Sequence, residues 1–318
     1  MPKDSTLYYI LLISPLLVAF LVVTTLIMLV VGYWIPAVIL LAIAALINWR
    51  TEAFALNFRS SQNNETDKET LKVLTYNLNR AYSTSVNYGS EQDVLKLIKK
   101  QEADIVLLQE FNPTLYSELN EGLKISYPYG TSDDEGNRFK SVFSRYPIAD
   151  YQQLDANGET LPICVMNVVV NGRKCCVATC HLMSNNFSVV YREIKNQGIN
   201  LMDGVKKTID VIRQGCKTRQ KQTEILLEYL KGTEAPILIC GDLNDVAQSN
   251  TMIRFAKAGY SDVWWKKGLG FGFTYWGMKM RFRLDHILYN ERLKPIWIHV
   301  IHSNLSDHRP LVATFNIG

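Results

Sequence analysis

The chain has 318 residues, of which 47% are hydrophobic and 20% are charged, and its formal net charge is +4. A chain of this length and composition can bury a large core and form one large domain or two small ones. The modest charge argues against a protein dedicated to coating nucleic acid, although it is compatible with local basic surfaces.

The N-terminal part of the chain is apolar. Residues 5–49 contain no Asp, Glu, Lys, Arg or His, and an uninterrupted helix of that length would far exceed the roughly 20 residues that cross a bilayer. Residues 32–36, Gly-Tyr-Trp-Ile-Pro, supply a break, because the aromatic pair suits a headgroup interface and proline favours the first turn of a helix. We therefore expect residues 1–59 to be a membrane region, a transmembrane hairpin with helices at about 7–31 and 35–49.

The positions of Lys and Arg predict the orientation of this hairpin. Lys3 precedes it, Arg50 and Arg59 follow it, and its loop carries neither residue type. Cytoplasmic loops carry the excess of Lys and Arg, so we expect a multi-pass protein of the inner or plasma membrane whose remaining chain lies in the cytoplasm. Two alternatives are a cleaved signal peptide, for which Ala42 and Ala44 supply a small-residue pattern, and a second segment that does not span, which would place the rest outside.

A polar linker at 60–70 is expected to separate the membrane region from a folded domain at 71–318. Residues 72–78 are strand-like. Residues 90–100 begin with Ser90, and Asp93 follows three residues later, which is a capping pattern at the start of a helix. Residues 103–109 are an apolar run typical of a buried strand. The order at the start of this domain is therefore strand, helix, strand.

Strands dominate the rest of the domain. Asn171-Gly172 joins two strand-like runs and is a strong hairpin signal. A helix is expected at 218–230, and strands are expected at 163–170, 174–181, 236–240, 281–289, 296–302 and 311–317. Many strands with few helices predict an α/β fold of two packed mixed sheets flanked by helices.

The stretch LICGDLND at 238–245 illustrates a recurring pattern, an apolar strand that ends in polar residues. Side chains at positions i and i+2 of a strand share a face, so Asp242 and Asn244 are expected to be presented together. We interpret the third polar residue, Asp245, as turn chemistry.

Similar polar endings follow other strand-like runs. A turn residue, a surface carboxylate or a buried structural histidine would each explain one of them, and Asp285 could simply pair with Arg283. We interpret His286, His299 and His302 as structural. The residues that share the pattern are Asn77, Glu110, His181, Asp242, Asn244, Asp285, Asp307 and His308.

These residues lie in motifs that resemble a known family. The segments TYN, QE, CHL, GDLND, RLDHI and SDHRP occur in this order between about Lys72 and Ile317. They resemble the motifs of the endonuclease/exonuclease/phosphatase superfamily of metal-dependent phosphoesterases, which includes DNase I-like nucleases, AP endonucleases, sphingomyelinases and inositol-polyphosphate phosphatases. The resemblance implies a four-layer α/β sandwich and a catalytic domain at 71–318.

The resemblance also implies a metal and a base. Glu110 matches the metal-binding carboxylate, and Asn77 and Asp307 lie at positions that complete or border the metal site. The chemistry favours a hard, oxygen-liganded ion such as Mg²⁺ or Mn²⁺. His308 matches the general base that takes a proton from the attacking water, and Asp285 matches the carboxylate that orients it.

The remaining roles concern the phosphate. Asp242 and Asn244 match the pair that positions the nucleophile or metal, with Asn244 as a phosphate ligand. His181 matches the histidine that contacts the phosphate and is the candidate to protonate the leaving group. AP endonucleases typically carry an Asp where Asn79 stands and a Tyr-containing motif where His181 stands, so base-excision repair is disfavoured.

Membrane attachment refines the expected substrate. A lipid phosphodiesterase or phosphatase finds its substrate at a bilayer, so we expect a membrane-anchored hydrolase that acts on a lipid or other small phosphoester. A membrane-tethered nuclease, with nucleic acid as its partner, is the second hypothesis. The third is a non-catalytic membrane scaffold of the same fold, which the complete set of motif residues disfavours.

Overall fold

The computed structural model describes residues 5–57, 69–78, 90–111, 117–130, 140–156, 159–185, 192–194, 196, 200–277 and 281–317. Of the predicted linker at 60–70, all but the last two residues lie outside the described ranges, as do Arg59 and Asn79.

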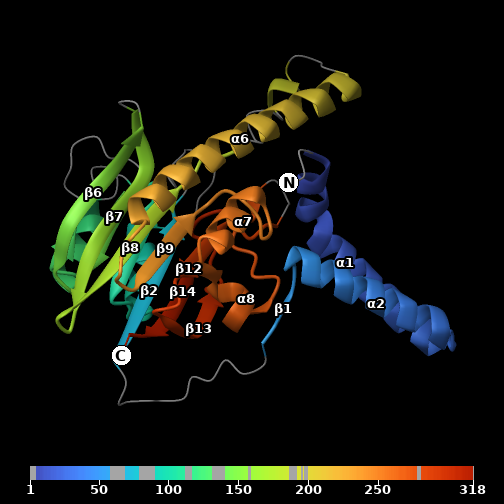
Figure 1. Ribbon diagram of the computed structural model, residues 1–318, viewed down its shortest axis with the longest axis horizontal. Coiled ribbons are helices and arrows are strands. Elements are labelled where there is room, and N and C mark those ends of the chain that lie inside the picture. The colour runs from blue at the N-terminus through green and yellow to red at the C-terminus, as the bar shows by residue number, and fades with distance from the viewer. Residues whose placement is uncertain are drawn as a thin grey trace.

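Two helices form the expected N-terminal hairpin. Helix α1 (Ser5–Val31) and helix α2 (Trp34–Thr51) lie side by side and extend away from the rest of the chain (Figure 1). Gly32, with a φ of 90°, makes the turn between them. By length and composition, the segments Ile13–Val31 and Trp34–Thr51 could each cross a membrane, with mean hydropathies of 2.6 and 1.6.

Two six-stranded mixed sheets form the body of the protein. The first contains, in spatial order, β13 (Lys294–Val300), β14 (Leu311–Asn316), β2 (Thr70–Asn77), β3 (Ile105–Gln109), β5 (Lys140–Ser144) and β4 (Tyr129–Gly130). The second contains β10 (Ser261–Asp262), β12 (Asp285–Tyr289), β9 (Ile237–Asp242), β8 (Arg173–His181), β7 (Glu159–Val170) and β6 (Ile148–Ala156). Pairs β2–β3 and β8–β9 are parallel, whereas the other pairs are antiparallel.

The sheets pack face to face, and helices cover their outer faces (Figure 1). Helices α3 (Glu91–Lys100) and α4 (Ser117–Ser126) bury Ile98 and Leu119 against the first sheet. Helices α6 (Leu201–Leu230) and α7 (Asn250–Lys257) bury Leu226 and Phe255 against the second. The predicted four-layer α/β sandwich is therefore confirmed.

The period-two alternation of the strands divides the space between the sheets into three tiers. Positions 71, 73, 105, 107, 175, 177, 238, 240 and 287 are apolar and form the core between the sheets. Next along the strands lies a polar tier, in which the Gln109 amide donates to the hydroxyls of Thr75 (3.1 Å) and Thr179 (3.3 Å) and so links the two sheets. The same inward face then ends in Asn77, His181, Asp242 and Asp285, because side chains two residues apart share a face.

A short third sheet ties the N-terminal hairpin to this body. Strand β1 (Ala55–Leu56) pairs with β11 (Leu269–Gly270), beside the short helix α8 (Val263–Lys267). Ala55 belongs to the core between the sheets, and Asn57 donates its side-chain amide to the carbonyls of Trp265 and Gly268. Residues directly after α2 therefore pack against the folded domain.

Several predicted elements have different bounds in the structure, and α6 differs most. Helix α6 begins at Leu201 rather than at residue 218, and a side-chain cap from Asn200 to the backbone of Asp203 starts it. The strand expected at 281–289 is shorter, since β12 begins at Asp285 and Phe282 instead forms an isolated bridge with Tyr275.

Candidate active site

Strand pairing brings the inward polar residues together. Asp242, the last residue of β9, lies directly opposite Asp285 of β12 and directly beside His181 of β8. Asn77 ends β2 in the facing sheet, where its register partner Gln109 is followed by Glu110. The C-terminal ends of β2, β3, β8 and β9 thus meet at one end of the sandwich.

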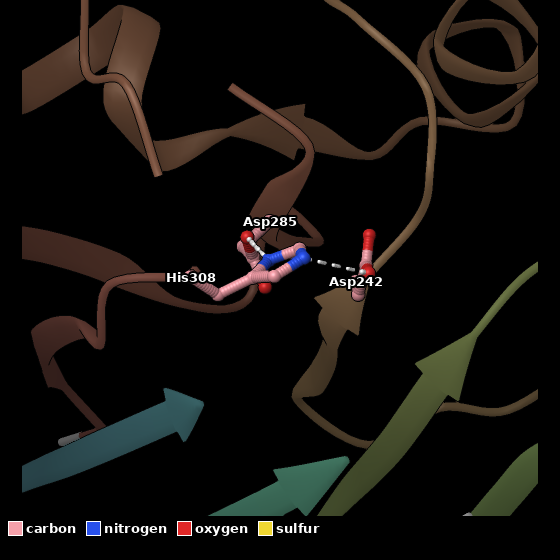
Figure 2. Close-up of side chains that lie close together, drawn as sticks. All are labelled: Asp242, Asp285 and His308. Atoms are coloured by element: carbon pink, nitrogen blue, oxygen red, sulfur yellow. Dashed lines mark hydrogen bonds and ion pairs between the residues drawn. The ribbon is translucent and has the colours of Figure 1, made fainter. Parts of the chain in front are cut away.

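Asp285 and His308 form a buried hydrogen-bonded pair beside Asp242. His308 Nδ1 lies 2.8 Å from Asp285 Oδ2, and His308 Nε2 lies 3.7 Å from Asp242 Oδ2, so that the imidazole lies between the two carboxylates (Figure 2). The Thr274 hydroxyl accepts hydrogen bonds from the backbone N–H groups of Leu284 and Asp285. This arrangement holds one imidazole nitrogen on a carboxylate and directs the other toward the space beside Asp242, as a general base requires.

The protonation of His308 depends on its neighbours. Burial opposes the charged imidazole, but the charges of Asp285 and Asp242 outweigh burial and raise the pKa of His308 to about 10. Burial likewise opposes ionisation of Asp285, but the His308 charge and hydrogen bonds from His308 and Thr274 lower its pKa. For Asp242, burial and then Asp285 raise the pKa, against the opposing effect of His308. Excess negative charge therefore surrounds His308 and favours its imidazolium form.

Asn77, Glu110 and His181 form a second cluster, which contacts the same Asp242 oxygen that His308 approaches. The Asn77 amide donates to Asp242 Oδ2 (3.0 Å) and to Glu110 Oε1 (3.4 Å). His181 Nε2 lies 3.5 Å from Glu110 Oε1 and 3.8 Å from Asp242 Oδ2. Glu110 has a positive φ of 55°, because the chain turns sharply where β3 ends.

Asp307 is connected to this cluster through Ser306. The Ser306 hydroxyl donates to the backbone carbonyl of Asn77 (2.9 Å) and lies 3.4 Å from Asp307 Oδ1. The structure therefore brings the sequence-predicted residues Asn77, Glu110, Asp307, His181, Asp242, Asp285 and His308 to one end of the sandwich.

Two groups of side chains could hold a divalent metal. Among the described residues, Asp242, Asp285 and His308 offer ligand atoms within 4.8 Å of one another. Two of these groups are already engaged with each other, however, since His308 Nδ1 lies 2.8 Å from Asp285 Oδ2. The carboxylates of Glu110 and Asp307 and the side-chain carbonyl of Asn77 offer the hard oxygen donors that Mg²⁺ and Mn²⁺ prefer. By the chemistry of their donor atoms, they match such an ion better.

Asn244 reaches the site by a different route from the predicted one. Strand β9 ends at Asp242, and Asn244 has a positive φ of 50°, so strand alternation does not align their side chains. Instead, the Asn244 backbone N–H donates to Asp242 Oδ1 (2.9 Å), and its side-chain amide donates to the Leu182 carbonyl (2.9 Å). Asn244 thus links the end of β9 to the segment that follows His181.

The interpretation of Asp245 as turn chemistry is wrong. Asp245 is buried, and its Oδ2 accepts a hydrogen bond from Nε of the fully buried Arg219 at 3.2 Å. Arg219 Nη1 also donates to the Met183 carbonyl (2.8 Å) and to Asn185 Oδ1 (3.0 Å). Asp245 therefore anchors α6 and, through Arg219, the segment after His181. Local sequence patterns did not reveal the pairing of Arg219 with Asp245, because the two residues are 26 positions apart.

Arg283 and His286 belong to a structural network behind the site. Arg283 binds Asp262 rather than Asp285, which removes the alternative that Asp285 serves only as its ion-pair partner. His286 Nδ1 lies 3.0 Å from Asp262 Oδ2, and its Nε2 lies 3.0 Å from the Asp245 carbonyl. Asp262 and Thr274 were not predicted, since neither lies in a motif that was singled out.

Comparisons with solved structures find the same fold in other proteins. A humanised TDP2 from D. rerio is 16% identical, with a TM-score of 0.57. The match covers 78% of this chain and 99% of the TDP2 chain. An endonuclease/exonuclease/phosphatase from Beutenbergia cavernae is 18% identical, with a TM-score of 0.57. The match covers 79% of this chain and 72% of the other chain. The human Nocturnin catalytic domain is 18% identical, with a TM-score of 0.55 and coverages of 78% and 94%.

No curated protein matches the chain in a sequence search. A sequence model described as "Endonuclease/Exonuclease/phosphatase family" does match, over residues 74–308. This range includes the strand ends and buried side chains described above, from Asn77 to His308. The chain belongs to the endonuclease/exonuclease/phosphatase family of phosphoester hydrolases.

Proposed function

We propose that the protein is a membrane-anchored, divalent-metal-dependent hydrolase that cleaves a phosphodiester or phosphomonoester of a lipid or small molecule. The observation that carries the proposal is the His308 imidazole, which lies between Asp285 and Asp242 at the end of the sandwich where Glu110 and Asn77 also lie.

The proposed chemistry follows from the positions of these side chains. Asp285 holds Nδ1 of His308, so that Nε2 can take a proton from a water beside Asp242 when the imidazole is neutral. A divalent cation bound near these carboxylates would favour the neutral form, because it would offset the negative charge that raises the pKa of His308. His181, next to Glu110 and Asp242, is positioned to contact the phosphate and to protonate the departing oxygen. Glu110, Asn77 and Asp307 would hold Mg²⁺ or Mn²⁺, which when bound neutralises charge on the phosphate oxygens.

A lipid substrate is supported by the contact between the hairpin and the domain. Ser14 and Pro15 of α1 line a small cavity of about 30 Å³ together with Phe273 and Phe282 of the folded domain. The Phe282 ring stacks on Tyr275 with centroids 6.5 Å apart, and the Tyr275 ring lies 4.9 Å from that of His308. A series of aromatic contacts therefore connects the domain surface beside the proposed membrane helices with the proposed base.

Hydrolysis is tested with the full chain in detergent micelles and bis-p-nitrophenyl phosphate as substrate. We expect turnover with Mg²⁺ or Mn²⁺, and its loss on addition of EDTA or in the variants His308→Ala and Asp242→Ala. His302→Ala is the matched control, because His302 is exposed and lies outside the cluster. Metal-independent turnover, or full activity of His308→Ala, would contradict the proposal. A soluble fragment should begin no later than Ala55, since a later start removes part of β1.

A substrate panel of sphingomyelin, phosphoinositides, plasmid DNA and RNA separates the lipid hypothesis from the nuclease hypothesis. One neighbour in the structural comparison is a D. rerio TDP2 complexed with a single-stranded DNA product, at 18% identity. Selective cleavage of a lipid supports the proposal, whereas selective cleavage of DNA or RNA by wild type and not by His308→Ala would make the protein a membrane-tethered nuclease. Orientation is tested by a reporter fused to the C-terminus, which we expect in the cytoplasm.

A further inference from the structure

Two arginines contact one tryptophan at the edge of the proposed active site. The guanidinium carbons of Arg281 and Arg309 lie 4.0 Å and 3.7 Å from the Trp276 ring centroid. Arg309 directly follows His308, and the Trp276 backbone N–H donates to the Asp307 carbonyl (2.8 Å). This group, which we call the Arg–Trp–Arg cluster, is therefore attached to the backbone that carries His308.

The cluster carries positive charge without a carboxylate partner. Among the described residues, neither Arg281 nor Arg309 forms an ion pair, whereas the buried Arg219 and Arg283 each pair with an aspartate. The face of an indole attracts cations, but two guanidinium groups close to the same ring also repel each other.

The Arg309 side chain has an unused hydrogen-bond donor. Its Nε is buried and has no hydrogen-bond partner among the described residues, and an unmade hydrogen bond at a buried charged donor is costly. Arg281 is exposed and Trp276 is half-buried, so a ligand can reach the cluster from solvent. A bound anion would neutralise the two charges and accept hydrogen bonds from the guanidinium groups.

We propose that the Arg–Trp–Arg cluster binds a second phosphoryl group of the substrate, next to the one that is cleaved. The planar guanidinium fork matches phosphate oxygens in a bidentate arrangement, and stacking on Trp276 restricts the orientation of each fork. The inference rests on the proposed function, in which the scissile phosphate lies beside His308. It names the substrate class as a lipid or small-molecule phosphoester that carries two phosphoryl groups.

The proposal is tested by competitive inhibition of bis-p-nitrophenyl phosphate hydrolysis by the full chain in detergent, at constant free Mg²⁺. Inositol 1-phosphate and inositol 1,4-bisphosphate are the two inhibitors. In wild type we expect the bisphosphate to inhibit at a concentration at least about tenfold lower, the effect of one charge-assisted contact. In Arg281→Gln and Arg309→Gln this ratio should fall toward one through weaker binding of the bisphosphate.

The controls separate the cluster from other effects. Arg292→Gln removes an exposed arginine at the opposite end of β12 and should keep the wild-type ratio. Arg281→Gln alters only an exposed side chain, so it remains informative even if Arg309→Gln fails to fold. A ratio that is unchanged in Arg281→Gln and in any folded Arg309→Gln overturns the proposal, as does equal inhibition of wild type by the two compounds.

Two further measurements separate this proposal from the proposed function. Isothermal titration calorimetry of both inositol phosphates needs no turnover, so the cluster is tested even if wild type does not hydrolyse the reporter substrate. A ten-nucleotide DNA strand is the third ligand. If the strand binds more tightly than the bisphosphate and loses that advantage in both arginine variants, the second phosphate belongs to nucleic acid and the small-molecule or lipid assignment is overturned.

Discussion

Replacement of Arg219 by Met tests whether the buried ion pair with Asp245 supports the active site. The change removes the bond to Asp245 Oδ2 and the bonds from Nη1 to the Met183 carbonyl and Asn185 Oδ1. It also leaves the Asp245 carboxylate buried without its cation. Loss of one partner of a buried ion pair costs about 3–5 kcal/mol.

This free-energy cost predicts a measurable change in thermal stability. For a domain of this size each 1 kcal/mol lowers the melting temperature by roughly 2–4 °C, so Arg219→Met should melt about 6–20 °C below wild type. The assay is thermal unfolding of the full chain in detergent, followed by near-ultraviolet circular dichroism. Activity should also fall, because Arg219 holds the segment that follows His181.

A double-mutant cycle identifies the cause of the loss. In Arg219→Met/Asp245→Leu no buried charge remains from this pair, so the double variant should be no less stable than the worse single variant. A melting temperature of Arg219→Met within about 2 °C of wild type, or a double variant whose loss equals both single losses added together, would refute the reasoning.

Three further variants test the site and its frame. Asp285→Asn should lower kcat roughly 10²–10⁴-fold, because an amide replaces the carboxylate that fixes the tautomer of His308 and stabilises its charged form. The pKa of His308 should also fall, so the acidic limb of the pH–rate profile should move to lower pH; an unmoved limb would contradict this role. Gly241→Ala should destabilise the fold by at least about 1–3 kcal/mol, since φ is 132° and a Cβ would lie 2.0 Å from the Cys180 carbonyl oxygen; an unchanged melting temperature would count against the strand geometry. For Asp262, burial opposes ionisation, but Arg283 and His286 outweigh it and lower the pKa, so its stabilisation is present above about pH 4 and is lost as the pH falls toward the folded-state pKa. Asp262→Asn should therefore melt below wild type at pH 7 and depend less on pH below about 4; parallel pH curves would exclude this linkage.

The sequence by itself determined the apolar hairpin and the paired sheets of the fold. An uncharged run at 5–49 is too long for a single helix that crosses a bilayer, so a break is expected, and Gly32 makes the turn with its positive φ. Continuous apolar strands, such as β3 and β9, are buried on both faces and need a layer on each side, which accounts for the sandwich. The motif residues from Asn77 to His308 could be selected because each followed such a strand.

Only the tertiary structure decided which of these side chains meet and what supports them. The distance along the chain between Asp242 and Asp285 does not reveal how their two strands pair. In the structure, β12 pairs with β9 in a register that places the two residues directly opposite each other. Local patterns also misassigned Asp245, because its partner Arg219 lies on a helix that packs against it from a distant part of the chain. Sequence periodicity reports which face a residue occupies, whereas contacts between residues far apart in the chain depend on strand order and helix packing, which a single sequence does not encode locally.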